Sequence, residues 1–166
     1  MELGESFIGS GPNAAHVNTV LGSREGPVGT AWATALASPS DGHAPFVVVL
    51  QPGLPVRPFT LFVNKAKVDG DHHAQLTWGA AQAGVAAGVA DTVAGGVLTE
   101  DEAEAMVLIA AVWVDPRADD PDAVYANNRE ATRGALIVGR ANLPAARDAA
   151  SKRNEAFNPF FTPPGR

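Results

Sequence analysis

Apolar and polar residues alternate along this chain with two different periods. Segments with a period of two predict strands, and longer segments with apolar residues every three or four positions predict helices. The expected strands cover residues 3–9, 14–21, 45–52, 59–69 and 105–114. The expected helices cover residues 26–38, 74–96 and about 122–142, with a short helical turn capped by Thr99 before the last strand.

This order of elements predicts an α/β protein of the α+β type, a two-layer sandwich in which helices cover a mixed sheet, with a ribosomal-protein-like topology. We expect one domain over residues 1–166, with a proline-rich C-terminal tail from about residue 144. Phenylalanines in that tail predict that it docks against a surface. The apolar run at 105–114 predicts a central strand covered on both faces.

The expected strand at 14–21 places two polar residues on one face. Alternate residues of a strand point to opposite sides, so His16 and Asn18 share a face, while Ala15 and Val17 share the other. Two polar groups on one face are typical of a cleft. The alternative, a core histidine satisfied by a backbone carbonyl, stays open at this point.

The expected helix at 74–96 is rich in small residues. Gly84 and Gly88 each cost roughly 1 kcal/mol relative to alanine in a helix interior, which predicts a close approach by the sheet, a ligand or another subunit. Gln82 lies among these small residues and predicts either an interface hydrogen bond or a ligand contact. In the following helix, Asn128 lies on an otherwise apolar stripe with Val124, Ala131, Ala135 and Val138.

Composition excludes several classes of function. The formal net charge of −6 and the scattered Lys and Arg residues argue against nucleic-acid and anionic-membrane partners. The chain has no cysteine, which excludes disulfides, a thiol nucleophile and a thiolate metal site. The N-terminus does not resemble a signal peptide, and no apolar run is long enough to span a bilayer. We therefore expect a cytoplasmic protein.

Most common catalytic motifs are missing from the sequence, including phosphate-binding and dinucleotide-binding loops and the nucleophile elbow. The stretch at 69–73, DGDHH, is expected to be a solvated loop rather than a metal site. The stretch at 64–67, NKAK, places Lys65 and Lys67 on the same side of an expected strand, which is typical of a solvated edge.

Several blocks of the sequence, taken in order, resemble the formaldehyde-activating enzymes. The resemblance extends over about residues 4–140, with a weaker match at NPF in the tail. The blocks are AHVNTVLG, GPVGTAWATAL, LQPGLPVRPFTLFVNK, WGAAQAGVAAGVAD and NREAT.

The resemblance implies a homopentamer of small α/β subunits with sites in the clefts between neighbours. It implies the condensation of formaldehyde with tetrahydromethanopterin to methylene-tetrahydromethanopterin and water, a lyase-type reaction of one-carbon metabolism, methylotrophy and formaldehyde detoxification. The pterin is then a co-substrate, with no tightly bound cofactor and no metal. An alternative is a paralogue that binds formaldehyde or another amine carrier as a sensing module, or a protein important for assembly alone.

The resemblance also implies roles for individual residues. His16 matches the catalytic histidine and is expected to be the general acid that protonates the leaving hydroxyl, because the unperturbed histidine pKa is about 6.5. Lys65, Gln82 and Val47 match substrate-binding positions, and Asn18 and Lys67 occupy two further substrate-binding positions. This chain departs from the family pattern at Asn18, where an aspartate is usual, and at Lys67, where a threonine is usual. We expect the loss of the carboxylate to lower the pKa of His16.

Overall fold

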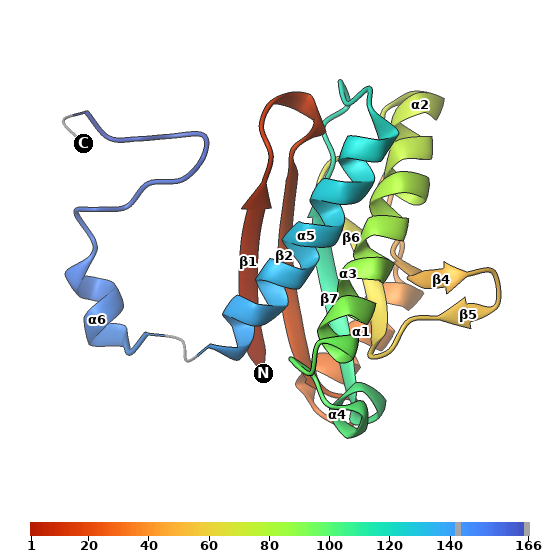
Figure 1. Cartoon of the computed structure of the whole chain (residues 1–166), viewed down its shortest axis with the longest axis horizontal. Helices are drawn as coiled ribbons and strands as arrows, with labels where there is room; N and C mark the ends of the chain where they lie inside the picture. Colours follow the sequence, from red (N-terminus) through yellow and green to blue (C-terminus); the bar gives the residue numbers. More distant parts are fainter. Residues whose placement is uncertain (142–143, 165–166) are drawn as a thin grey trace.

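The computed structural model describes residues 1–141 and 144–164 and contains a five-stranded mixed sheet. Its strand order is β1-β2-β7-β6-β3, and every neighbouring pair is antiparallel except β6 and β7. This sheet, with helices packed on it, confirms the expected α/β sandwich (Figure 1). The strands are β1 (Glu2–Ile8), β2 (Ala15–Ser23), β3 (Phe46–Val47), β6 (Phe59–Asn64) and β7 (Met106–Trp113).

Two long helices, α3 (Gln82–Ala94) and α5 (Pro121–Arg140), lie side by side on one face of the sheet (Figure 1). A short two-stranded ribbon of β4 (Val49–Gln51) and β5 (Leu54–Pro55) projects on the side of the sheet away from β1 (Figure 1). The remaining helices are α1 (Pro27–Ala37), α2 (Gly70–Gln75), α4 (Glu100–Ala105) and α6 (Ala146–Ser151), with a 3-10 turn η1 (Gly11–Asn13) and a π-helical turn η2 (Leu76–Ala81). No helix in the described ranges has the length and apolar character needed to cross a membrane.

The core lies between the sheet and these two helices. Ala15 and Val17 of β2 are fully buried, and so are Val85 and Val89 of α3, which confirms the period-two and period-four patterns. His16 and Asn18 alternate with the buried residues and lie on the opposite face of β2, as expected.

The glycines of α3 allow close contact with another helix. A Cβ atom added to Gly84 would lie 2.4 Å from the backbone oxygen of Tyr125, and one added to Gly88 would lie 2.4 Å from that of Arg129. Both neighbours belong to α5. The close approach that the sequence predicts is therefore helix-to-helix.

Two expectations about residues 59–73 are wrong. The strand ends at Asn64, because the Asn64 side chain donates to the carbonyls of Gly42 and Ala66 and turns the chain. The DGDHH stretch contributes to α2 instead of a solvated loop. In it, His73 is buried, accepts at Nδ1 from the backbone N–H of Asp69 and contacts the Val114 carbonyl through Nε2.

Other boundaries also differ from the expected ones. The segment 45–52 is divided into β3 and β4. Helix α5 ends at Arg140, and Asn142, where we expected its end, lies outside the described residues. Val138 is half exposed, because it falls on the solvent side of α5. β7 is central but is fully covered on one face only, since Ile109, Ala111 and Trp113 are only partly buried.

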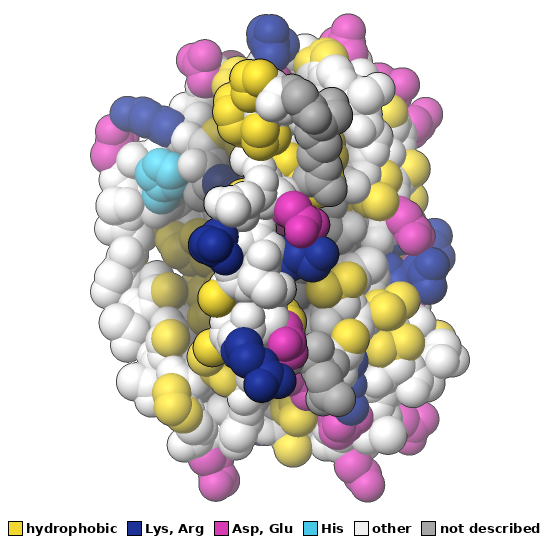
Figure 2. All heavy atoms as spheres, turned by 90° about the vertical axis from the view of Figure 1, so that its left-hand side faces the viewer, with side chains coloured by type: hydrophobic (Ala, Val, Ile, Leu, Met, Phe, Trp, Pro, Cys, Tyr) yellow, Lys and Arg dark blue, Asp and Glu magenta, His cyan; other side chains and the backbone are white. Residues whose placement is uncertain are grey.

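The C-terminal tail extends beyond the β1 edge of the sheet (Figure 1). It returns to the body through Phe160, whose ring packs edge-on against Phe7 and Trp113, with centroids 5.4 Å and 6.0 Å apart. These ring contacts confirm the expected docking for Phe160, although its side chain, like those of Phe157 and Phe161, is largely exposed. Figure 2 shows positive and negative side chains interspersed on the face from which the tail projects, without a basic patch.

Candidate functional site

His16 forms a close pair with a carboxylate on the neighbouring strand. Its Nε2 lies 2.8 Å from the Oε1 of Glu5 on β1. The antiparallel register places Glu5 opposite Asn18 and Phe7 opposite His16, so both β1 side chains lie on the same face as the imidazole. The side chain of His16 is about one quarter exposed. His16 is therefore partly exposed, although its Nε2 is buried against Glu5, and it is not a core histidine satisfied by a backbone carbonyl.

The side chain of Lys65, which follows β6, crosses β7 and reaches the face of β2 that carries His16 and Asn18. Its backbone N–H donates to the carbonyl of Val112, which extends the β6–β7 pairing by one residue. Its Nζ donates to the Oδ1 of Asn18 and, at 3.3 Å, to the backbone carbonyl of His16. Two residues far apart in the sequence, His16 and Lys65, are thus joined through β2.

The charges of this group shift one another's pKa values. Burial lowers the pKa of His16 below its ordinary value, the ammonium of Lys65 lowers it further, and Glu5 opposes both effects. Burial also lowers the pKa of Lys65 to about 8, although the Glu5 carboxylate acts in the other direction. These shifts bring the pKa of Lys65 closer to neutral pH and move that of His16 further below it, so at pH 7 the imidazole of His16 is neutral more often than that of an exposed histidine.

Aromatic rings and a cavity border this group, which we call the His16 cluster: Glu5, His16, Asn18 and Lys65. The ring of Phe7 lies 5.7 Å from that of His16, and Trp113 is the β7 residue paired with His16. A cavity of about 470 Å³ adjoins these rings; its lining includes Phe7, Trp113, Asp115, Arg117, Pro159 and Phe160. The tail therefore closes one side of the space beside the cluster.

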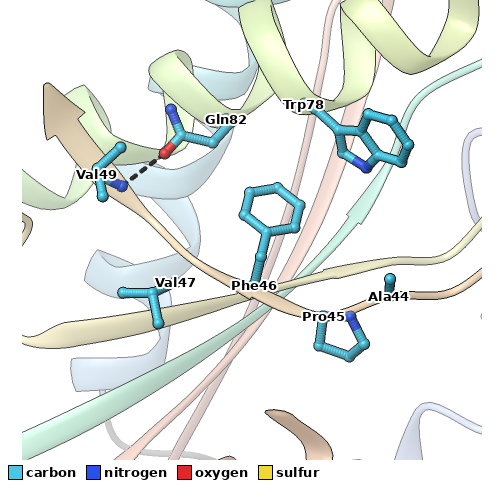
Figure 3. A pocket seen from close by; sticks show the side chains of 7 residues that line it. All are labelled: Ala44, Pro45, Phe46, Val47, Val49, Trp78 and Gln82. Carbon is cyan, nitrogen blue, oxygen red and sulfur yellow. Dashed lines mark hydrogen bonds between the residues drawn. The ribbon is translucent and has the colours of Figure 1, made fainter. Parts of the chain in front are cut away.

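Gln82 and Val47 lie at a different place on the chain. Both line an apolar cavity of about 400 Å³ together with Ala44, Pro45, Phe46, Val49 and Trp78. Phe46 points from β3 toward the helix that presents Trp78 and Gln82 (Figure 3). The Oε1 of Gln82 accepts a hydrogen bond from the backbone N–H of Val49 at 2.6 Å, so this side chain holds β4 against the helix. The two cavities share no lining residue.

Lys67 does not join the His16 cluster. Its Nζ forms an exposed ion pair with Asp41, and its side chain lies against Gly42. Because β6 ends at Asn64, Lys65 and Lys67 diverge instead of sharing one side of a strand. Lys67 borders the loop that leads to Ala44 and Pro45 of the apolar cavity.

Within residues 1–141 and 144–164, no three His, Asp or Glu side chains are grouped closely enough to hold a metal ion.

Sequence reasoning missed Glu5, Phe7 and Trp113 near His16, and Trp78 and Phe46 near Gln82. Glu5 and Phe7 were within reach of prediction, because pairing the first two expected strands across the turn at residues 9–13 places them beside Asn18 and His16. The aromatic residues of the apolar cavity meet only through tertiary packing.

Comparison with known proteins assigns the family. A family model described as formaldehyde-activating enzyme matches residues 3–161. The chain is 41% identical over 158 residues to 5,6,7,8-tetrahydromethanopterin hydro-lyase of Methanosarcina barkeri, an alignment that covers 95% of this chain and 89% of the relative.

Similar segments occur in longer proteins. The bifunctional enzyme Fae/Hps of Methanococcoides burtonii is 43% identical over 136 residues, which cover 82% of this chain and 34% of the relative. That of Methanosphaera stadtmanae is 38% identical over 160 residues, which cover 96% of this chain and 39% of the relative. The chain thus spans well under half the length of these bifunctional relatives. The family match and these identities show that the chain belongs to the formaldehyde-activating enzyme family.

Proposed function

We propose that this protein condenses formaldehyde with tetrahydromethanopterin to methylene-tetrahydromethanopterin and water. The observation that supports this most directly is the pairing of His16 with Glu5 on a partly exposed face, at the family's histidine position and beside Lys65. The name of the relative from Methanosarcina barkeri, a tetrahydromethanopterin hydro-lyase, supports the pterin as co-substrate.

The reaction requires a proton at one oxygen atom. A pterin amine adds to formaldehyde and gives a carbinolamine, whose hydroxyl leaves as water only after protonation. The imidazolium of His16 supplies that proton from Nδ1, because the buried Nε2 faces the carboxylate of Glu5, which keeps the ring in place and favours its charged form. The second pterin amine then closes a five-membered ring on the iminium carbon and releases a proton, which returns to His16.

The apolar cavity around Gln82 and Val47 suits the pterin ring, because it offers the rings of Trp78 and Phe46. On one chain this cavity and the His16 cluster are separate. We therefore propose a homopentamer in which the cavity of one subunit and the His16 cluster of its neighbour meet in an intersubunit cleft. Lys67, at the rim of the cavity, contacts the outer part of the pterin. Asn18 holds Lys65 in place.

We further assign the protein to the cytoplasm and to one-carbon metabolism, where a reduced pterin carrier collects formaldehyde. No tightly bound cofactor or metal takes part in this scheme.

The test is the initial rate of methylene-tetrahydromethanopterin formation, measured above the spontaneous background, for the wild type, His16→Ala and the control His72→Ala. His72 is exposed, and its Nε2 contacts the Ala118 carbonyl. Loss of a general acid lowers rates by roughly 10²–10⁴-fold, and we expect a fall of that size for His16→Ala alone. A wild-type rate equal to the background would refute the proposed function.

A further inference from the structure

The three lysines of the chain have different partners. Lys67 pairs with the carboxylate of Asp41, and Lys152 pairs with that of Glu155 at 3.0 Å. Lys65 instead donates to two neutral acceptors, the Asn18 amide oxygen and the His16 backbone carbonyl. In the described part of the chain, no carboxylate lies within ion-pairing distance of Lys65. The environment of Lys65 therefore stabilises the protonated amine less than the environments of Lys67 and Lys152 do.

The number of acceptors around Lys65 fits a neutral amine. An ammonium carries three N–H donors, whereas a neutral primary amine carries two N–H donors and a lone pair. The two acceptors take up two N–H bonds, and a neutral Lys65 would keep its lone pair available. The partly buried position works in the same direction, since it lowers the pKa of this amine to about 8. Glu5 on β1 and His16 on β2 are the titratable groups that act on it.

We propose that Lys65 is a nucleophile that captures formaldehyde before the pterin does. The inference rests on the formaldehyde chemistry of the proposed function and adds a covalent step to it. The Nζ lone pair forms a bond to the formaldehyde carbon, and the N–H proton moves to the oxygen, which gives a carbinolamine on Lys65. His16 protonates the hydroxyl, water leaves, and the nitrogen electron pair forms the C=N bond of an iminium.

Transfer of the formaldehyde carbon from Lys65 to the pterin regenerates the free amine of Lys65. A pterin amine attacks the iminium carbon, and the resulting aminal breaks its bond to Nζ as the second pterin amine closes the ring. Nζ leaves with a proton as the amine that began the cycle, so the net reaction is unchanged. His16 is well placed to protonate both leaving groups, first the carbinolamine hydroxyl and then Nζ of the aminal, because Lys65 is hydrogen-bonded to the backbone of the same residue.

The experiment is reductive trapping without pterin. The wild-type protein is treated with ¹³C-formaldehyde and sodium cyanoborohydride at pH 7.4, and N-methylation of each lysine is followed over time by peptide mass spectrometry. Since an ordinary lysine has a pKa of about 10.4, we expect Lys65 to be methylated roughly ten- to hundredfold faster than Lys67 or Lys152. Asn18→Asp, which places a carboxylate beside Nζ, should remove most of this difference, while Gln51→Glu, which adds a carboxylate at an exposed position of β4, should not.

The two proposals fail independently. If Lys65 is methylated no faster than Lys152, the covalent step is wrong, even where condensation with the pterin exceeds the background. Rapid methylation of Lys65 combined with no condensation would instead overturn the proposed function and keep the capture step. Lys65→Arg supplies a further check, because an arginine retains the charge and donors but not the nucleophile. Condensation by Lys65→Arg at the wild-type rate overturns the covalent step.

Discussion

The Nζ of Lys65 and the Oδ1 of Asn18 are joined by a hydrogen bond that passes over β7, the strand between them. Ala111 is the β7 residue opposite Asn18, and its small side chain leaves room for the lysine to cross. An aspartate at position 18 would make this contact an ion pair. Compared with an aspartate, Asn18 therefore changes the pKa values of the His16 cluster but keeps the same hydrogen-bond partner, Lys65.

Asn18→Asp should raise the pKa of His16. A carboxylate on the same face of β2 stabilises the imidazolium, which the wild-type residue cannot do electrostatically. NMR titration of the imidazole resonances measures the pKa directly, with His43 as an internal reference whose ring contacts the Asn64 carbonyl. A pKa in the variant equal to or below that of the wild type contradicts this account.

Glu5→Gln should move the pH–rate profile toward acid. Glu5 raises the pKa of His16 against burial and Lys65, so its removal lowers that pKa further. The acid form of His16 exists below its pKa, and the rate at neutral pH should therefore fall, with less effect at low pH. We expect a fall of about two- to fivefold, the range for a partly exposed ion pair worth roughly 0.5–1 kcal/mol.

The measurement is kcat/KM against pH after subtraction of the spontaneous reaction. Glu25→Gln is the control, because Glu25 is exposed on the turn before α1. An equal fall at all pH values would mean that Glu5 acts on something other than the proton equilibrium of His16.

Gly84→Ala should destabilise the protein by about 1–3 kcal/mol, because the added methyl group meets the backbone of α5 and forces the two helices apart. Gly79→Ala is the matched control in the preceding π-helical turn, where a Cβ meets no atom within 4 Å. The control should stabilise by roughly 0.5–1 kcal/mol through reduced backbone entropy. Urea denaturation of both variants gives the two free energies of unfolding, and equal values would show that α3 and α5 tolerate separation.

Phe160→Ala should release the tail from the body. Each aromatic pair contributes about 0.5–1.5 kcal/mol, so loss of both contacts, with Phe7 and with Trp113, should raise tryptic cleavage near α6 by roughly five- to 150-fold. Phe161→Ala is the matched control, since this side chain is exposed to a similar degree and the backbone of the residue pairs with Asn158. Cleavage at the same rate in both variants would show that the ring contacts do not hold the tail.

Patterns that act over a few residues predicted the sheet and the main helices. The alternation in β2 correctly placed His16 and Asn18 on one face, because the strand period of two is fixed by local geometry. The capping box that begins α4 at Thr99 was likewise readable, since its partners are three residues apart.

Long-range contacts account for what could not be predicted. Asn64 ends β6 by binding the carbonyl of Gly42, and nothing within the NKAK stretch indicates that contact. His73 is buried against Val114, so a helix formed where the local composition favoured a loop. Lys65 was identified by resemblance alone, and its neutral partners became visible only once the strand order was known.

The position of β7 has a consequence for the order in which the protein is made. His16 and Lys65 are both synthesised before residues 106–113, yet they become neighbours only when β7 enters the sheet between β2 and β6. A nascent chain on the ribosome therefore contains the imidazole and the amine without the strand that brings them into register. The two residues to which we assign the reaction with formaldehyde, an electrophile able to cross-link amines, are therefore brought together only after that strand has emerged.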